Sequence, residues 1–234
     1  MATRLLLLSN SRDAAGAFLE WPRDAIRSLL GDARRLVFVP YASVRTGADD
    51  YTALVRGALG ALGHEVRSVH ESDDPAAAVR GAEGIVVGGG NTFHLLRRLY
   101  ETNLLAAIRD RARSGVPYLG WSAGSVVAGP TMRTTNDMPI VEVPSLDALG
   151  LVPFQINAHY TDAHPPGFRG ETRAERLAEF VTVNPTLPVV GLPEGTGLRV
   201  EGTRISFFGA EPARIFRHGH EVALVGPGEA LDVT

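Results

Sequence analysis

The chain has 234 residues, enough for one large α/β domain with a core that needs no disulfide or metal. Its net charge of −3 offers no basic surface, which excludes nucleic acid and anionic membranes as partners. The absence of cysteine excludes disulfides, thiolate metal sites and a cysteine nucleophile. The apolar run 5–8 is too short for a signal-peptide core or a membrane span. We therefore expect a soluble, cytoplasmic protein.

The first half of the chain alternates short apolar runs with helical patterns, which predicts βαβ units around a mostly parallel sheet. An apolar stripe over 51–62 has helical spacing. Three more helices are expected to begin at capping residues, namely Asp74 before Pro75, Asn91 or Thr92, and Asn103. The strands predicted here are 5–8, 36–39, 65–69, 85–87 and 117–120.

The second half is less regular. Residues 130–166 carry many turn-forming residues and predict long connections around one or two short strands. Thr172 and Glu175 form a capping-box pattern, so a helix is expected there. A further buried strand is predicted at 188–192, and β-hairpins from 197 onward. No repeat or linker is present, so residues 1–234 are expected to form a single domain.

The segment Gly120–Gly124 has the G-x-S-x-G pattern of a nucleophile elbow. In such an elbow a strand turns sharply into a helix and exposes the serine hydroxyl, here that of Ser122. The N–H of Ala123, at the helix start, could stabilise a developing oxyanion. The pattern also fits an ordinary strand-to-helix turn. Its place after one predicted strand and before a helix-compatible stretch favours the catalytic interpretation.

A glycine run, Gly88-Gly89-Gly90, also follows a predicted strand. A dinucleotide-binding loop would need glycine at position 93, where Phe93 stands, so the nucleotide interpretation is weak. Since the ends of parallel strands converge on one crevice, we expect the Gly89 or Gly90 N–H to serve the same oxyanion hole.

A serine nucleophile needs a base and a carboxylate that orients the base. Of the seven histidines, His159 ends a short strand-like run and is the best candidate. His164 lies nearby, but their spacing fits no zinc motif, so no metal site is predicted. Glu194 lies just past the strand 188–192 and is expected at the same sheet edge as Ser122, while Asp137 lies in a turn. Spacing alone does not decide which of the two acids orients the histidine.

At these residues the sequence resembles peptidase E, the aspartyl dipeptidase family of serine peptidases. The matching motifs extend over nearly the whole chain in the family's order. They are Leu6-Leu7-Leu8-Ser9-Asn10-Ser11, Asp49-Asp50-Tyr51-Thr52, Val87-Gly88-Gly89-Gly90-Asn91-Thr92-Phe93, Gly120-Trp121-Ser122-Ala123-Gly124, Arg133-Thr134-Thr135-Asn136-Asp137-Met138-Pro139-Ile140, Gln155-Ile156-Asn157-Ala158-His159, Gly170-Glu171-Thr172-Arg173 and Gly191-Leu192-Pro193-Glu194-Gly195. The chief departure is Ala158, where relatives carry proline.

The resemblance implies a three-layer α/β sandwich like that of the class I glutamine amidotransferases, a flavodoxin-like fold, with serine in place of their elbow cysteine. It also implies hydrolysis of Asp-Xaa dipeptides without a cofactor. Among the residues linked to catalysis in the family, Ser122, His159, Asp137 and Glu194 match. We favour Glu194 as the orienting acid, because it ends a strand, and assign Asp137 to a supporting or amino-group-binding role.

An acidic substrate side chain calls for a planar cation. Arg173 is the first candidate and Arg133 the second, with Asn91 as a further substrate-binding residue. Three alternatives stay open: a serine exopeptidase for β-aspartyl or cyanophycin-type bonds, a catalytically inactive amidotransferase-like binding protein, and a nucleotide-binding protein. The sequence also leaves homo-oligomerisation open.

Overall fold

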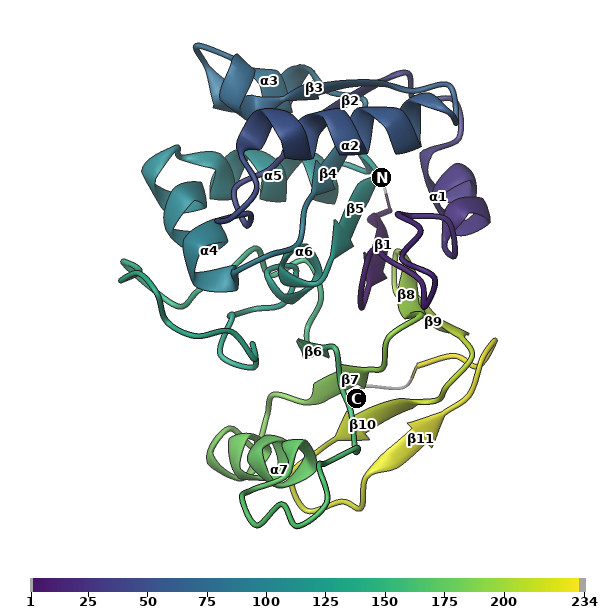
Figure 1. Ribbon diagram of the computed structural model, residues 1–234, viewed down its shortest axis with the longest axis vertical. Helices are drawn as coiled ribbons and strands as arrows, with labels where there is room; N and C mark the ends of the chain where they lie inside the picture. Colours follow the sequence, from purple (N-terminus) through teal and green to yellow (C-terminus); the bar gives the residue numbers. More distant parts are fainter. Residues whose placement is uncertain (1, 232–234) are drawn as a thin grey trace.

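The computed structural model describes residues 2–231. Its larger sheet has the strand order β3-β2-β4-β5-β1-β8-β9, with β1 to β5 parallel and β8 and β9 antiparallel to their neighbours (Figure 1). The predicted mostly parallel central sheet is thus confirmed. Its strands are β1 (Arg4–Leu8), β2 (Arg35–Val39), β3 (Glu65–Ser68), β4 (Gly84–Val87), β5 (Tyr118–Trp121), β8 (Thr196–Glu201) and β9 (Arg204–Gly209).

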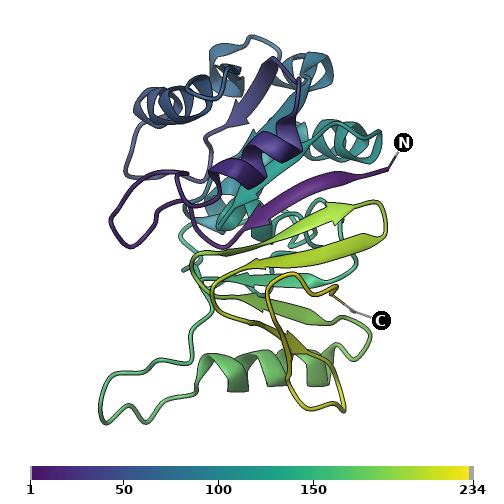
Figure 2. The same cartoon turned by 90° about the vertical axis from the view of Figure 1, so that its right-hand side faces the viewer.

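Helices cover both faces of this sheet, because each inner strand is apolar on both sides. Leu6 and Leu8 of β1 belong to the same core cluster as α1 (Arg23–Leu30) and α2 (Ala48–Gly60). Alternate residues of β1 face a second cluster, which includes three other helices. They are α3 (Pro75–Gly81), α4 (Thr92–Glu101) and α5 (Leu104–Arg113). Figures 1 and 2 show the sheet between these two helical layers, as expected for a three-layer α/β fold.

Capping chemistry explains where several helices begin. Asp74 and Asn91 each accept a hydrogen bond from a backbone N–H in the first turn of the helix that follows, as predicted. Thr172 forms the predicted capping box at the start of α7 (Arg173–Val183). Asn103 does not cap α5 as expected. It adopts a left-handed conformation with φ of 54°, which asparagine tolerates better than most residues, and its side chain makes no capping bond.

A second, smaller sheet lies below the first in Figure 1, in the order β11-β10-β7-β6. Its strands are β6 (Gln155–Ala158), β7 (Val189–Leu192), β10 (Ala213–Phe216) and β11 (Ala223–Val225). The predicted strand 188–192 is therefore present, but it belongs to this small sheet and not to the large, mostly parallel one. The reason is that β8, which follows β7 directly, occupies the place beside β1. Residues 193–195 consequently cross from one sheet to the other.

One core cluster joins the two sheets. It contains Leu5 and Val87 from the large sheet together with Ile156 and Val190 from the small one, and all four are fully buried. A continuous apolar core of this kind supports the proposal that the chain is a single domain.

Candidate active site

Ser122 sits on a sharp turn between β5 and the short helix α6 (Ala123–Val126). Its φ of 51° and ψ of −116° are unusual for any residue other than glycine. A β-carbon at Gly124 would lie 2.2 Å from the Val87 carbonyl oxygen, so only glycine allows the turn to pack this closely. The Ser122 N–H donates to the Leu8 carbonyl at 3.0 Å, which fixes the turn to β1. The predicted elbow geometry is present.

His159 follows β6 and also has a positive φ, of 54°. Its backbone N–H donates to the Ser9 hydroxyl at 2.9 Å, and this hydroxyl donates to the Leu192 carbonyl at 2.8 Å. Ser9 is fully buried at the end of β1. It therefore joins the large sheet to the ends of both β6 and β7 and fixes the backbone from which the imidazole projects.

The three side chains expected to form a relay are in contact. Nε2 of His159 lies 3.0 Å from Oγ of Ser122, and Nδ1 lies 2.7 Å from Oε1 of Glu194. Since a carboxylate can only accept, Nδ1 carries the proton and Nε2 is free to accept from the serine. The His159 and Glu194 side chains are 42% and 66% exposed. The pair is therefore open to solvent, which screens the charge of the carboxylate.

Asp137 does not contact His159. Its Oδ2 accepts from the Thr92 N–H at 2.7 Å and from the Thr92 hydroxyl at 2.6 Å. The Thr135 hydroxyl donates to the same oxygen at 3.1 Å. Asp137 thus binds the N-terminus of α4, where a negative charge is favoured. Of the two acids left open by the sequence, Glu194 is the one beside the imidazole.

The glycine loop after β4 packs directly on the elbow, since a β-carbon at Gly89 would lie 2.9 Å from Cβ of Ser122. The Gly89 N–H donates to the Tyr51 hydroxyl at 3.0 Å, so this predicted oxyanion donor is already engaged. Among the described residues, the N–H groups of Gly90 and Ala123 have no partner. These two are the better candidates for an oxyanion hole.

Tyr51, on α2, connects the glycine loop to the elbow. Its buried hydroxyl accepts from Gly89 N–H and from Trp121 Nε1 at 2.9 Å, and it donates to the Gly89 carbonyl at 3.2 Å. All hydrogen-bonding positions of the hydroxyl are therefore used. Burial raises the pKa of Tyr51 to about 12, although the Trp121 hydrogen bond acts in the opposite direction, so the hydroxyl stays protonated at neutral pH.

Replacing Tyr51 with phenylalanine is expected to lower the free energy of unfolding by about 2 kcal/mol, because two N–H donors lose their acceptor. Denaturant unfolding measures this change. The matched control is Tyr100→Phe, which removes a more exposed hydroxyl that donates to the Asp147 carbonyl at 3.0 Å. It should cost no more than about 0.5 kcal/mol. Equal losses in the two variants would contradict a special role for Tyr51.

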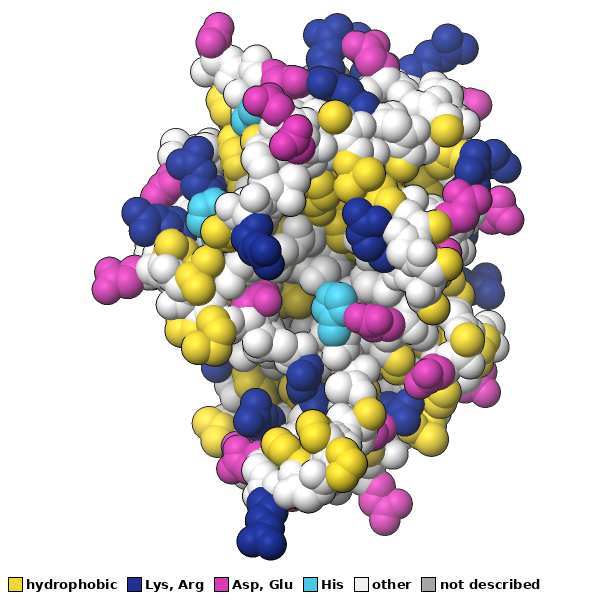
Figure 3. Space-filling view, viewed as in Figure 1, with side chains coloured by type: hydrophobic (Ala, Val, Ile, Leu, Met, Phe, Trp, Pro, Cys, Tyr) yellow, Lys and Arg dark blue, Asp and Glu magenta, His cyan; other side chains and the backbone are white. Residues whose placement is uncertain are grey.

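A pocket of about 470 Å³ opens beside Ser122, and we call it the nucleophile pocket. The face drawn in Figure 3 is hollowed near its centre, where basic, acidic and histidine side chains gather. The pocket is lined by residues of the elbow, the glycine loop, α2 and the loops after β1, β2, β6 and β7. They are Asn10, Ser11, Arg12, Asp13, Phe18, Ser43, Thr46, Tyr51, Leu54, Gly89, Gly90, Trp121, Ser122, His159 and Glu194.

The predicted substrate-binding arginines line a different hollow, of about 590 Å³, together with Asp137 and Asn157; we call it the arginine hollow. Arg173 is half-buried, and burial and then neighbouring Arg176 lower its pKa. Its guanidinium donates a long hydrogen bond of 3.4 Å to Asn157, and no carboxylate among the described residues pairs with it. Among the residues that the structure describes, no anion therefore offsets the cost of burying the Arg173 cation.

The other two predicted substrate-binding residues are engaged within the protein. Arg133 is exposed, donates to Asn184 at 2.8 Å and stacks over the Phe180 ring at 5.2 Å. Asn91 accepts from the His94 N–H at 3.0 Å and donates to the Met138 carbonyl at 2.9 Å. These contacts indicate that both residues shape the surrounding loops.

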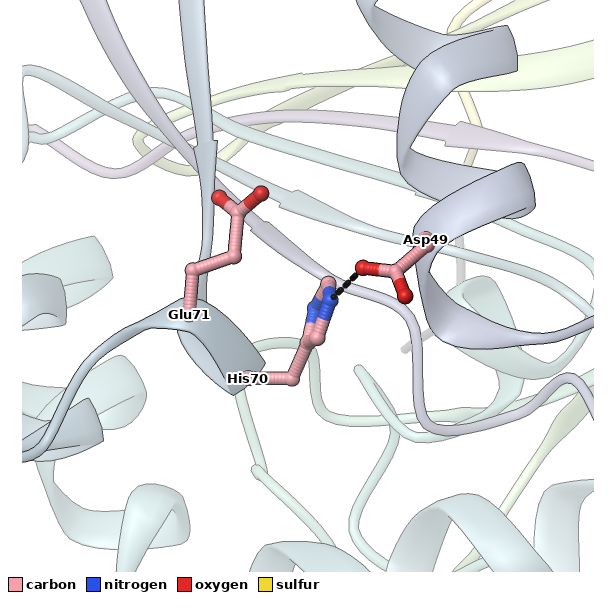
Figure 4. Close-up of side chains that lie close together, drawn as sticks. All are labelled: Asp49, His70 and Glu71. Carbon is pink, nitrogen blue, oxygen red and sulfur yellow. Dashed lines mark hydrogen bonds and ion pairs between the residues drawn. The ribbon is translucent and has the colours of Figure 1, made fainter.

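Among the described residues, one group has metal-ligand spacing, formed by Asp49, His70 and Glu71 (Figure 4). Each member already has a protein partner. His70 Nε2 lies 3.0 Å from Asp49, its Nδ1 lies 2.5 Å from the Ser68 hydroxyl, and Glu71 accepts from Arg56 at 2.6 and 2.8 Å. The arginine supplies the positive charge that a metal would bring, so these residues do not fit a metal centre.

Two residues that hold the relay were missed from the sequence. Ser9 and Asn10 directly follow a buried strand, and this was a usable signal for a site at that sheet edge. Asn10 Oδ1 accepts from the Gly195 N–H at 2.8 Å, which fixes the turn that carries Glu194. No local pattern indicated that a tyrosine on α2 would reach the elbow.

A serine on a strained strand-to-helix turn, in contact with an imidazole that contacts a carboxylate, defines the class of serine hydrolases on an α/β fold. The chain belongs to peptidase family S51, whose profile matches residues 5–208. It is therefore a serine-type peptidase, and the resemblance drawn from the motifs is confirmed.

Two relatives illustrate this membership, and one solved structure has a similar fold. Peptidase E of Shewanella amazonensis is 48% identical over 231 residues, which cover 99% of this chain and 98% of that protein. Peptidase E of Nostoc sp. is 45% identical over 233 residues, covering 99% and 96%. A peptidase from an acI-B1 Actinobacterium shares the fold, with a TM-score of 0.71 at 20% identity, covering 99% of this chain and 97% of that one. Within residues 2–231, no helix is long and apolar enough to cross a membrane.

Proposed function

We propose that this protein is a dipeptidase that hydrolyses Asp-Xaa dipeptides through an acyl-enzyme at Ser122. The observation that carries the proposal is the unbroken contact from Ser122 Oγ through His159 to Glu194, at 3.0 and 2.7 Å. The names of the relatives support the activity. The proposal places the enzyme in the cytoplasm, where a chain without cysteine is unaffected by reducing conditions.

In the proposed mechanism, His159 takes the Ser122 proton as the hydroxyl oxygen attacks the peptide carbonyl carbon. The N–H groups of Gly90 and Ala123 stabilise the oxyanion of the tetrahedral intermediate. The intermediate collapses when His159 gives the proton to the leaving amine, which leaves an aspartyl ester on Ser122. Water, deprotonated by His159, then attacks the ester and releases aspartate. Glu194 keeps the imidazole in the required tautomer and stabilises its charged form.

The arginine hollow accounts for the preference for aspartate. A half-buried guanidinium without a carboxylate partner suits an anionic side chain, because the ion pair removes the cost of burying the cation. Asp137 borders the same hollow, and its Oδ1 has no hydrogen-bond partner among the described residues. A carboxylate at this position suits the free α-ammonium group of the substrate. The two charges together match an N-terminal aspartate.

Turnover of a panel of Xaa-Leu dipeptides tests the proposal. Asp-Leu is expected to be cleaved in strong preference to Asn-Leu, Glu-Leu and Ala-Leu. The isomer with a β-aspartyl bond should be a poor substrate, because its scissile carbonyl is displaced by one methylene relative to the two charges. Preferential cleavage of the β-aspartyl isomer would instead establish the alternative exopeptidase. No turnover of any member, with no labelling of Ser122 by a small fluorophosphonate, would overturn catalysis itself.

Arg173→Met is expected to lower kcat/KM for Asp-Leu by about 100-fold, since a charge-assisted contact in a partly buried site is lost. The change should be small for Asn-Leu, so that the preference for aspartate nearly disappears. Arg27→Met is the control, since Arg27 is an exposed helical arginine that lies 3.7 Å from Asp24 and does not line the arginine hollow. Equal kcat/KM of Arg173→Met and parent on Asp-Leu would contradict the assignment of the aspartate site.

A further inference from the structure

The nucleophile pocket opens at the three side chains of the relay. Its lining includes His159 and Glu194, and it shares no residue with the arginine hollow, which the proposed function assigns to aspartate. In serine peptidases the imidazole delivers its proton to the leaving amine and therefore faces the leaving residue. The nucleophile pocket is thus the place for the second residue of the dipeptide.

Apart from His159, the described residues that line the pocket include two acids and one basic side chain. Asp13 and Glu194 are the acids, and Arg12 is the cation. The second residue of a dipeptide ends in a free carboxylate, which two nearby negative charges would repel. A carboxylate can therefore enter this pocket only where a cation balances them. Arg12 supplies that charge, and among the described residues it is paired with no carboxylate.

Arg12 is held in place although it is exposed. Its Nη1 donates to the Gly16 carbonyl at 2.6 Å, and its guanidinium carbon lies 5.5 Å from the centre of the Phe18 ring. The Phe18 ring in turn packs edge-on against Trp121, at 5.9 Å between centroids. The remaining N–H groups of the guanidinium have no partner among the described residues and are free to bind a carboxylate with two hydrogen bonds.

The loop that carries Arg12 is fixed to the relay. Asn10 donates to the Arg12 carbonyl at 2.6 Å, and the same side chain accepts from the Gly195 N–H at 2.8 Å. Gly195 directly follows Glu194. One asparagine side chain thus ties the backbone of Arg12 to the turn that carries Glu194.

We propose that Arg12 binds the free α-carboxylate of the residue after the scissile bond, so that the nucleophile pocket selects dipeptides over longer peptides. The assignment rests on the proposed function, which supplies the direction of the substrate. It also predicts a limit on peptide length through charge recognition, since a third residue would replace the carboxylate with a neutral amide and extend past the guanidinium.

The test compares Asp-Leu with its C-terminal amide, which keeps the shape of the substrate and removes the charge. For the parent enzyme the ratio of kcat/KM, acid over amide, is expected to be about 10 to 100, the size of a charge-assisted hydrogen-bonded contact. In Arg12→Met this ratio should fall close to one, chiefly through a higher KM for Asp-Leu. Arg12→Lys keeps the positive charge but not the planar guanidinium that can donate two parallel hydrogen bonds, and it should give an intermediate ratio.

Arg45→Met is the matched control, because Arg45 is an exposed arginine on the neighbouring loop after β2 and does not line the pocket. It should keep the parent ratio. An unchanged ratio in Arg12→Met, with both substrates still cleaved, would overturn the subsite while leaving the proposed function intact. Failure of the parent to cleave either substrate would overturn the proposed function, and the Arg12 assignment with it.

Discussion

Ser122→Ala is expected to lower kcat/KM for Asp-Leu by about 10⁵-fold, because no other group can form the acyl-enzyme. Initial rates at low substrate concentration give this value. The fold should be unaffected, since among the described residues the Ser122 hydroxyl hydrogen-bonds only to the imidazole, at 3.0 Å, while its backbone N–H bond to Leu8 is kept. Thermal unfolding of the variant serves as the control. Retention of more than about one hundredth of the parent activity would show that another nucleophile is used.

Glu194→Gln is expected to lower kcat by about 10²- to 10³-fold, because the positively charged imidazole loses its counter-charge. The loss should be smaller than for a buried acid, since Glu194 is 66% exposed and water partly replaces its charge. The effect should appear in single-turnover rates on Asp-Leu, with the fold intact because the side chain lies at the surface.

Asp137→Asn is the comparison variant, because it neutralises the other acid that the sequence left open. Its expected effects are a higher KM, through the α-ammonium group of the substrate, and a stability loss of about 1 kcal/mol at the start of α4. If Asp137→Asn lowered kcat more than Glu194→Gln, the orienting role would belong to Asp137, despite its contacts with Thr92.

Local chemistry predicted most of the elements of the large sheet. The leucines of β1 and the valines of β4 are consecutive, so only a strand buried on both faces accommodates them. The caps Asp74, Asn91 and Thr172 likewise follow from short-range hydrogen bonds. Helix α1 was not predicted, because Pro22 precedes it and only Ile26, Leu29 and Leu30 of its residues are buried.

The sequence predicted which residues form the candidate site, but not which of them contact one another. Glu194 follows a predicted strand and Asp137 lies in a turn, but only the pairing of β7 with β6 and β10 decides which acid reaches His159. That pairing depends on contacts distant in sequence, which local patterns do not contain. The hydrogen bond from the Gly89 N–H to the Tyr51 hydroxyl could not be predicted for the same reason, since the two residues lie on separate elements.

Because residues 193–195 cross between the sheets, the residues of the relay are attached to two different sheets. The serine is attached to the large sheet, whereas the histidine and its acid leave adjacent parallel strands of the small one. A slight rigid-body rotation of one sheet against the other would separate Oγ from Nε2 and spare the imidazole–carboxylate contact. Catalytic alignment thus depends on how the two sheets are held against each other. The side-chain hydrogen bonds of Ser9 and Asn10 connect the sheets at this point and maintain that alignment.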